Sequence, residues 1–365
     1  MRMDEKQALK KQALKMIGDI SSANGVSGFE DEVVALLRRY SEGLGETRED
    51  KMRDFYIERG ENKGGRLKVQ LDAHSDEVGF MVQAIRDNGT MDFIALGGWV
   101  PATVPAHRVR VRTKTGNYIP GLIASKPPHF MTEAERAAPP SLQQMVIDVG
   151  ASSRQEAMEG FGVRVGAPVV PDADFEFIEE HNLMIGKAFD CRLGCAALLG
   201  TLRELRGEAL DVDVVGAFAV QEEVGTRGAI ITTGTVKPDI GIVFEGCPAD
   251  DTFTPPYAIQ TALGKGPMLR HIDSRMITNP RFQRFALELG EELGIPTQEA
   301  VRSGGATNGE RLHLSGIGVP VIVIGLPVRY IHTHYGIASY TDYENAVALA
   351  CQVLRRLNEA VYKGF

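Results

Sequence analysis

The sequence predicts an α/β fold in which helices flank a mixed, mostly parallel sheet, with a small β-barrel inserted into it. Before residue 76 and after residue 170, continuous apolar strands alternate with helices, which is typical of a sheet buried on both faces. Between these segments the chain changes to short alternating runs separated by Gly, Pro and Asn, which is typical of a barrel or a sandwich. We therefore predict a discontinuous α/β domain, residues 1–75 and 171–365, and an inserted β-rich domain, residues 76–170.

Two helices and a strand are predicted first. Apolar residues recur at helical spacing between Leu9 and Ile20. A second helix is predicted to begin near Ser27, because Ser27 and Glu30 form the S-x-x-E pattern of a capping box. The alternating run 67–71 then predicts a strand that leads into Asp-Ala-His at 72–74.

The middle of the chain has the pattern of short strands. We expect them at Val78 to Gln83, Met91 to Leu96, Arg108 to Arg112 and Ile119 to Ile123. The segment from Lys126 to Pro140 is rich in proline and polar residues, and we expect an exposed loop there.

Strands and longer helices alternate again after residue 170. The predicted strands are 212–220, 240–244 and 319–324, and the predicted helices are 191–205, 278–293 and 342–362. Because these strands are apolar throughout rather than at every second position, we expect helices on both faces of the sheet.

Composition excludes several classes of protein. The 365 residues include 40 Lys and Arg against 48 Asp and Glu, and this formal net charge of -8 argues against a nucleic-acid partner. The sequence has no apolar run of about 18 residues, which a membrane helix needs, and residues 1–20 lack a signal-peptide core. The four cysteines are too few for a disulfide framework in a chain of this length. We expect a cytoplasmic protein with no membrane or nucleic-acid partner.

Polar residues that follow predicted strands indicate a site, because α/β sheets bind ligands where their strands end at the carboxyl edge. They are His74 and Asp76, Asp190, Glu222 and Glu223, Glu245, and His332 and His334. Each one alone has an ordinary structural explanation. Together, two histidines and several carboxylates at one edge predict a divalent-metal site, since imidazole suits zinc or cobalt and carboxylates can bridge two ions.

The adjacent glutamates suggest a division of labour. Two neighbouring ions polarise a carbonyl and lower the pKa of a shared water, and a spare carboxylate then serves as general base. Neighbouring side chains in a strand point to opposite faces, so one of Glu222 and Glu223 can bind metal while the other reaches the water. Asp76, two residues after His74, is placed to orient its imidazole. The Gly-rich turn 303–308 is a candidate wall of a substrate pocket, and Cys191 is expected to pack in the core.

Seven segments resemble the metallopeptidases of clan MH, and specifically the glutamyl or deblocking aminopeptidase group. They are DAHSDEVGFMV, LGGWVP, GLIASKPPH, IDVGASSRQEA, AFDCRLGCAALL, AVQEEVGTRGA and RYIHTHYGIAS. The resemblance runs in order from about residue 25 to the C-terminal helix. It implies a phosphorylase/hydrolase-like catalytic domain, an inserted dimerisation domain, and two divalent ions per subunit, either zinc or cobalt, with manganese possible. It also implies dimers that assemble into a tetrahedral dodecamer, and some members of the group are labelled endoglucanases.

The resemblance also implies a role for each candidate residue. Carried over by motif, these roles are metal binding by His74, Asp190, Glu223, Glu245 and His332, general base catalysis by Glu222, and support of His74 by Asp76. Asp190 would bridge the two ions, with Glu245 beside His74 and His332 beside Glu223.

Three departures from the family pattern affect these assignments. Many members have Asp where Glu245 stands, the usual Gly-Gly-Thr-Asp turn is Gly-Gly-Ala-Thr-Asn at 304–308, and the usual His-Ser-Pro is His332-Thr333-His334. His334 is therefore a rival ligand to His332.

The predicted function is the metal-dependent removal of N-terminal residues from short peptides. Two alternatives remain open. One is a glycoside hydrolase that uses paired carboxylates such as Glu222 and Glu245, which would leave the histidines without a role. The other is a non-catalytic assembly protein built on the same fold.

Overall fold

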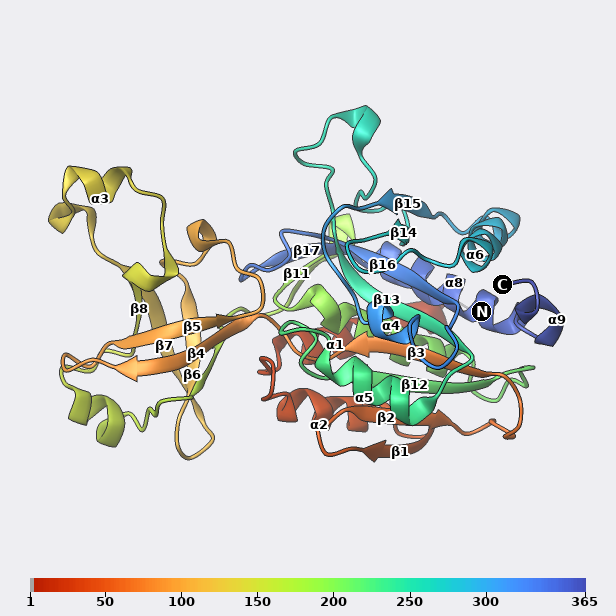
Figure 1. Ribbon diagram of the computed structural model, residues 1–365, viewed down its shortest axis with the longest axis horizontal. Helices are drawn as coiled ribbons and strands as arrows, with labels where there is room; N and C mark the ends of the chain where they lie inside the picture. The colour runs from red at the N-terminus through yellow and green to blue at the C-terminus, as the bar shows by residue number, and fades with distance from the viewer. Residues whose placement is uncertain (1–2) are drawn as a thin grey trace.

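A helix-covered sheet and a closed β-barrel lie side by side in the computed structural model (Figure 1). The structure describes residues 3–365, so the first two residues of the predicted α/β segment lie outside it. The predicted mixed sheet and the small barrel are both confirmed. The exact division of the chain into two domains stays a prediction.

Eleven strands form the sheet within residues 3–365, in the order β1-β2-β12-β3-β13-β16-β17-β11-β10, with β14 joining at β16 and β15 beyond it. Their bounds are β1 Gly45–Glu49, β2 Phe55–Arg59, β3 Lys68–His74, β10 Glu176–Ile178, β11 Leu183–Gly186, β12 Asp213–Ala219, β13 Ile240–Pro248, β14 Met268–Ile272, β15 Gln298–Val301, β16 Val321–Arg329 and β17 Gly336–Ser339. The central strands β12, β3, β13 and β16 are parallel, whereas the strands outside them pair antiparallel, except for β14 with β15. The carboxyl ends of the four central strands therefore meet at one edge.

Helices cover both faces of this sheet. They are α1 Met3–Ser22, α2 Asp31–Tyr40, α4 Phe189–Glu204, α5 Arg227–Val236, α6 Pro280–Leu293, α7 Gly309–Leu312, α8 Tyr340–Arg356 and α9 Glu359–Tyr362. The helix predicted over 342–362 is two helices, because Leu357 is extended and Asn358 caps α9 through its side chain. Among the described residues, no helix is long and apolar enough to cross a membrane.

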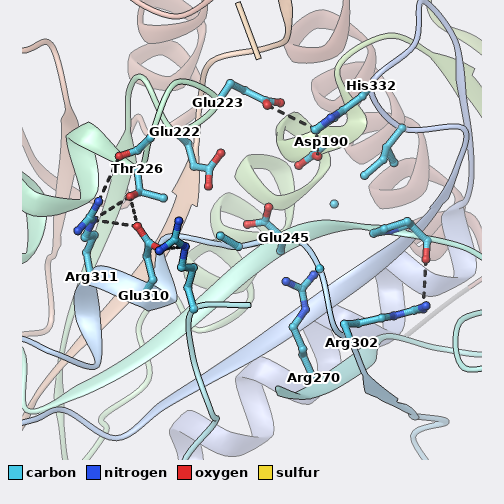
Figure 2. A pocket seen from close by; sticks show the side chains of 18 of the residues that line it. Asp190, Glu222, Glu223, Thr226, Glu245, Arg270, Arg302, Glu310, Arg311 and His332 are labelled. Atoms are coloured by element: carbon cyan, nitrogen blue, oxygen red, sulfur yellow. Dashed lines mark hydrogen bonds and ion pairs between the residues drawn. The ribbon is translucent and has the colours of Figure 1, made fainter. Parts of the chain in front are cut away.

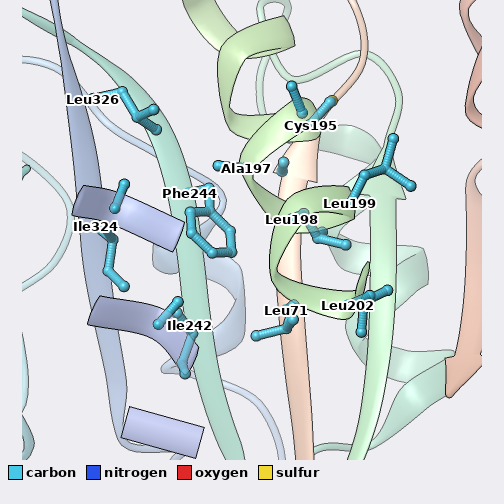
Figure 3. Close-up of a cluster of buried hydrophobic side chains, with 14 of the residues drawn as sticks. Leu71, Cys195, Ala197, Leu198, Leu199, Leu202, Ile242, Phe244, Ile324 and Leu326 are labelled. Carbon is cyan, nitrogen blue, oxygen red and sulfur yellow. The ribbon is translucent and has the colours of Figure 1, made fainter. Parts of the chain in front are cut away.

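The core confirms that the central strands are buried on both faces. On β13, Ile242 and Phe244 pack in the cluster beneath α4, while Val243 points to the opposite face and packs with Ala229 of α5 and Leu312 of α7 (Figure 3). Because successive side chains of a strand alternate between faces, a strand that is apolar at every position needs helices on both sides. This burial holds the strand ends, and the polar residues after them, in fixed positions.

Six antiparallel strands close into the barrel in the order β4-β5-β8-β7-β6-β9. Their bounds are β4 Gly79–Ile85, β5 Met91–Leu96, β6 Arg108–Arg112, β7 Tyr118–Ser125, β8 Met145–Asp148 and β9 Pro168–Pro171. The barrel has its own apolar core, which includes Phe80, Val109, Ile123 and Ile147. The predicted loop 126–140 is exposed but contains a short capped helix, α3 Glu133–Ala137.

Candidate metal centre

The candidate residues gather at the carboxyl edge of the four parallel strands. β3 ends at His74, and the turn after β12 carries Glu222 and Glu223. Glu245 lies within β13 rather than after it, because the strand continues for three more residues. His332 lies in the loop between β16 and β17. Strand pairing therefore brings together residues that are far apart in the sequence.

Asp190 lies at the centre of this group, at the start of α4, where its backbone is not helical. Its Oδ1 is 3.2 Å from Nε2 of His74, and its Oδ2 is 3.2 Å from Nε2 of His332. Next to His74, Glu245 Oε1 lies 3.8 Å from His74 Nε2. Next to His332, Glu223 Oε2 lies 3.4 Å from His332 Nε2 (Figure 2). Each oxygen of Asp190 thus faces one histidine, and each histidine also faces one further carboxylate.

Asp76 contacts both His74 and the turn that carries Glu222 and Glu223. Its Oδ1 accepts a hydrogen bond from the backbone N of Glu222 at 2.9 Å and lies 3.3 Å from Nδ1 of His74. Its Oδ2 accepts hydrogen bonds from Ser27 Oγ at 2.6 Å and from the backbone N of Glu223 at 3.1 Å. A single buried carboxylate therefore orients the His74 ring and fixes the turn that carries both glutamates.

The predicted capping box at Ser27 and Glu30 is wrong. Helix α2 begins at Asp31 and has no side-chain cap. Ser27 donates to Asp76 instead, and Glu30 Oε1 accepts hydrogen bonds from the backbone N of Gly28 and of Gln221. These distant partners, Asp76 and Gln221, take the place of the local cap, and both side chains hold loops of the site.

At Asp190, burial is outweighed by contacts with His332 and His74, which lower the pKa of that carboxyl, but burial makes the three glutamates of the site hard to ionise. It raises the pKa of Glu222 to about 7 and raises the pKa of Glu223 and of Glu245 well above the ordinary value. Burial alone would lower the pKa of His332, but the carboxylates of Asp190 and Glu223 raise it to about 9. These shifts have a common cause, which is a dense group of negative charges out of water.

The donor set fits divalent cations. Within the part of the chain that the structure describes, the buried atoms Glu223 Oε1 and Glu245 Oε2 have no hydrogen-bond partner. Ligand atoms of Asp190, Glu223 and His332 all lie within 4.8 Å of one another. Buried carboxylates of this density need counter-charges, and carboxylate with imidazole is a donor set that suits zinc, cobalt or manganese.

Two residues near the site have partners outside it. His334 packs against barrel residues, with its ring centroid 3.9 Å from that of His107 and 5.1 Å from that of Trp99. The structure thus brings His332, and not its rival, beside Asp190. Cys191 lies close to His74, but its thiol donates to the carbonyl of Phe244 at 3.1 Å, as expected of a core residue.

A cavity of about 650 Å³ opens over the carboxylates. Its far wall contains residues that the sequence did not reveal, namely Arg270, Arg275, Arg302, Glu310 and Arg311. Figure 2 labels all of them except Arg275. Arg270 follows the buried Met268 and Leu269 of β14, and a charged residue beside buried apolar ones is the one signal that could have pointed to this wall. This volume is large enough for the N-terminal residue of a peptide and its neighbour.

The Gly-rich turn contributes only partly to this cavity. Ser303 to Ala306 line it, as predicted for a pocket wall. Thr307 and Asn308 are fully buried instead. Asn308 Nδ2 donates to Asp72 Oδ1 at 2.7 Å. The amide at 308 therefore suits the carboxylate at 72, since a second carboxylate would place two like charges in contact.

Comparison with known proteins decides the family. The sequence profile of the M42 glutamyl aminopeptidases matches residues 55–349. The chain belongs to this family. It is 32% identical over 342 residues to the glutamyl aminopeptidase of Lactococcus lactis, covering 93% of this chain and 95% of that one. The structure of a TET aminopeptidase from a marine sediment archaeon of the Thaumarchaeota matches with a TM-score of 0.93 and 37% identity, over 97% and 99% of the two chains.

A second solved structure is the TET1 peptidase of Pyrococcus horikoshii, described as able to assemble into a tetrahedron or a large octahedral shell. It matches with a TM-score of 0.85 and 25% identity, over 94% of this chain and all of that one. This M42 chain is therefore a metal-dependent aminopeptidase, and its fold is that of the TET peptidases.

Proposed function

We propose that this M42 aminopeptidase removes N-terminal residues from short peptides at a centre of two divalent ions. His74 and Glu245 hold one ion, Glu223 and His332 hold the other, and Asp190 lies between them. The observation that carries this assignment is that Asp190 faces His74 with one oxygen and His332 with the other, both at 3.2 Å. Zinc or cobalt suits these ligands best, and manganese is an alternative. When bound, such a pair of ions polarises the scissile carbonyl and lowers the pKa of a water.

Glu222 is the general base in this proposal. Its carboxylate lines the cavity, and its Oε2 lies 4.0 Å from His74 Nε2, farther than the nearest oxygen of Asp190 or Glu245. Burial raises its pKa to about 7, which suits a group that takes a proton from water and passes it to the leaving amine nitrogen. Asp76 acts as a positioning residue, because it holds the backbone of Glu222 and Glu223.

Peptide length and assembly belong to the same proposal. The cavity has space for an N-terminal residue and its neighbours, and the TET relatives support a homo-oligomer. We place the dimer contact on the barrel, which exposes Ile94, Leu122, Phe130 and Val165, and we expect dimers to build a dodecamer. Light scattering after size-exclusion chromatography measures this directly, and a monomeric mass would contradict it. The four cysteines are free and buried, which supports a reducing compartment such as the cytoplasm.

The alternatives explain less of the site. A glycoside hydrolase that uses Glu222 and Glu245 gives no role to His74, His332 or Asp190, which contact one another at the centre. A non-catalytic assembly protein has no need to gather the carboxylates of Asp190, Glu222, Glu223 and Glu245 at one cavity, because taking them out of water costs free energy without a compensating partner.

Release of free amino acid from unblocked peptides and from their N-acetylated twins tests the function. The assay is run on the enzyme as purified, after chelation, and after zinc, cobalt or manganese is added back. We expect cleavage of the unblocked peptides alone, loss on chelation and recovery with metal. Chelator-resistant activity on a glucan would favour the glycoside hydrolase, and no cleavage with any metal would contradict the proposal.

A further inference from the structure

The loop that carries His332 has an unusual backbone. Tyr330 has φ 63° and His332 has φ 56°, so two non-glycine residues of one short loop lie in the left-handed region. Each such residue costs free energy, and it persists only where its surroundings hold it there. The conformation of this loop decides where the His332 ring points. What holds the loop is therefore part of the site.

The inserted barrel packs directly on this loop. The ring of His334 is buried and stacks on His107, with ring centroids 3.9 Å apart and planes 17° apart. It also contacts Trp99 at 5.1 Å, and Trp99 stacks on Phe80 of β4 at 4.7 Å. Trp99 is fixed in turn, because its Nε1 donates to the carbonyl of Gly79 at 3.1 Å. Neither ring nitrogen of His334 has a hydrogen-bond partner among the described residues, so its shape rather than its polarity joins the loop to the barrel.

The turn after β5 contacts the site itself. A Cβ added to Gly98 would lie 3.1 Å from Nδ1 of His332, so the backbone of this turn lies directly against that ring. A Cβ added to Gly97 would lie 3.0 Å from Oε2 of Glu223. A methyl group at either position would press on the side chain that faces it, so this turn limits where the His332 and Glu223 side chains can lie.

We propose that the barrel is a positioning element of the catalytic centre. Its Gly97-Gly98 turn and the stack of His107, His334 and Trp99 hold His332 with Nε2 toward Asp190 and Glu223. This inference rests on the ligand role proposed for His332, and it gives the barrel a role in every subunit that is independent of any contact between subunits.

Metal binding by the chelator-treated full chain tests the inference without relying on activity. Cobalt is titrated and its visible absorption recorded, and zinc binding is measured by calorimetry. His334→Ala removes the stack, whereas His334→Phe keeps a flat ring. Gly98→Ala places a methyl group against His332, and Gly160→Ala is its matched control, because Gly160 also lies in the inserted segment and an added Cβ there meets only Glu156 Cγ at 3.5 Å.

We expect His334→Ala and Gly98→Ala to weaken one metal site by about 10- to 100-fold, as loss of a ligand's supporting contact does. His334→Phe and Gly160→Ala should titrate like wild type. Thermal unfolding of each variant shows whether His334→Ala has simply lost the fold, and Gly98→Ala gives the answer if it has.

His332→Ala separates the two ways of failing. If His332→Ala loses a metal site while His334→Ala and Gly98→Ala bind normally, the positioning role is refuted and the proposed ligands stand. If His332→Ala binds metal like wild type, the ligand role of His332 is wrong and the inference falls with it.

Discussion

Replacing Asp76 with asparagine tests the support of the whole site by one side chain. Asp76 receives hydrogen bonds from the backbone N of Glu222 and Glu223 and from Ser27 Oγ, and it lies 3.3 Å from Nδ1 of His74. Asparagine has nearly the same volume, but only one of its two terminal atoms accepts a hydrogen bond. Its amide oxygen is best placed toward Glu222 N and His74, where both partners are donors. Its NH₂ then faces Ser27 Oγ, which accepts after rotation, and Glu223 N, which cannot.

The partly buried backbone N–H of Glu223 is therefore left without an acceptor. Such a donor costs about 1–3 kcal/mol. If the whole cost opposes catalysis or metal binding, kcat/KM or metal affinity falls by about 5- to 150-fold, since about 1.4 kcal/mol is a factor of ten. We expect Asp76→Asn to lose that factor in kcat/KM on a dipeptide and in affinity for the metal held by Glu223. Ser27→Ala is the matched control, because it removes one hydrogen bond to Asp76 and leaves Glu223 N paired.

Two measurements settle this prediction. Steady-state hydrolysis of a dipeptide gives kcat/KM, and titration of the metal-free protein gives the affinity. If Asp76→Asn matches wild type in both, the turn that carries Glu222 and Glu223 is held by other contacts and the reasoning fails.

Four further predictions follow from the same structure. Glu222→Gln should lower kcat by about 100- to 10,000-fold, the usual contribution of a general base, with metal content unchanged by elemental analysis; wild-type turnover would disprove the role. Gly216→Ala places a Cβ 2.8 Å from Leu198 Cδ2 and should lower the free energy of unfolding, measured in urea, by about 1–3 kcal/mol. Leu198→Ala should lower it by about 2–5 kcal/mol. The double variant should lose less than the sum of the two, and strict additivity would contradict the packing. Burial raises the pKa of Asp342 from 3.8 to about 6, so the folded state favours its protonated form. Its contribution to the free energy of unfolding should therefore fall by no more than about 3 kcal/mol as pH rises from 3.8 through 6. Asp342→Asn should flatten the plot of stability against pH over this range, and an unchanged plot would assign the pH dependence to other groups. Counted over residues 3–365, the four arginines of the far wall pair with only three carboxylates, Asp250, Asp273 and Glu310, which leaves an excess of positive charge there. A peptide with N-terminal Glu should therefore show a lower KM than its Lys counterpart, and equal values would refute this reasoning.

The sheet and the position of the site were predictable because both depend on short-range patterns. A run such as Ile240 to Phe244 is apolar at every position, and this pattern alone predicts a strand covered on both faces. Parallel strands then bring His74, Glu222 and Glu245 to one edge without further information. The roles of these residues came from the family resemblance and remain proposals.

The contacts that fix the site were not predictable from sequence. The pattern at Ser27 and Glu30 is that of a local cap, yet both side chains have partners far along the chain. The choice between His332 and His334 depends on backbone angles within one loop, which no sequence spacing encodes. The arginines of the cavity depend on the placement of β14 and β15 at the end of the sheet.

Buried ion pairs hold the chain at the point where it leaves the sheet for the barrel. The residue that follows Asp76 is Glu77, which is buried and accepts from Lys187 Nζ at 2.7 Å and 3.0 Å. Arg192 lies 3.5 Å from the same carboxylate and donates to the carbonyls of Ile20, Ala23 and Gly25. Buried ion pairs of this kind often add little net stability, because desolvation offsets their attraction, but they allow only one arrangement of the groups that they join. Here they fix the chain one residue from the carboxylate that orients His74 and the glutamates, so the barrel starts from a rigid point beside the metal centre. A barrel fixed in this way can return to the site through Gly98 and hold His332, which a loosely tethered domain could not do.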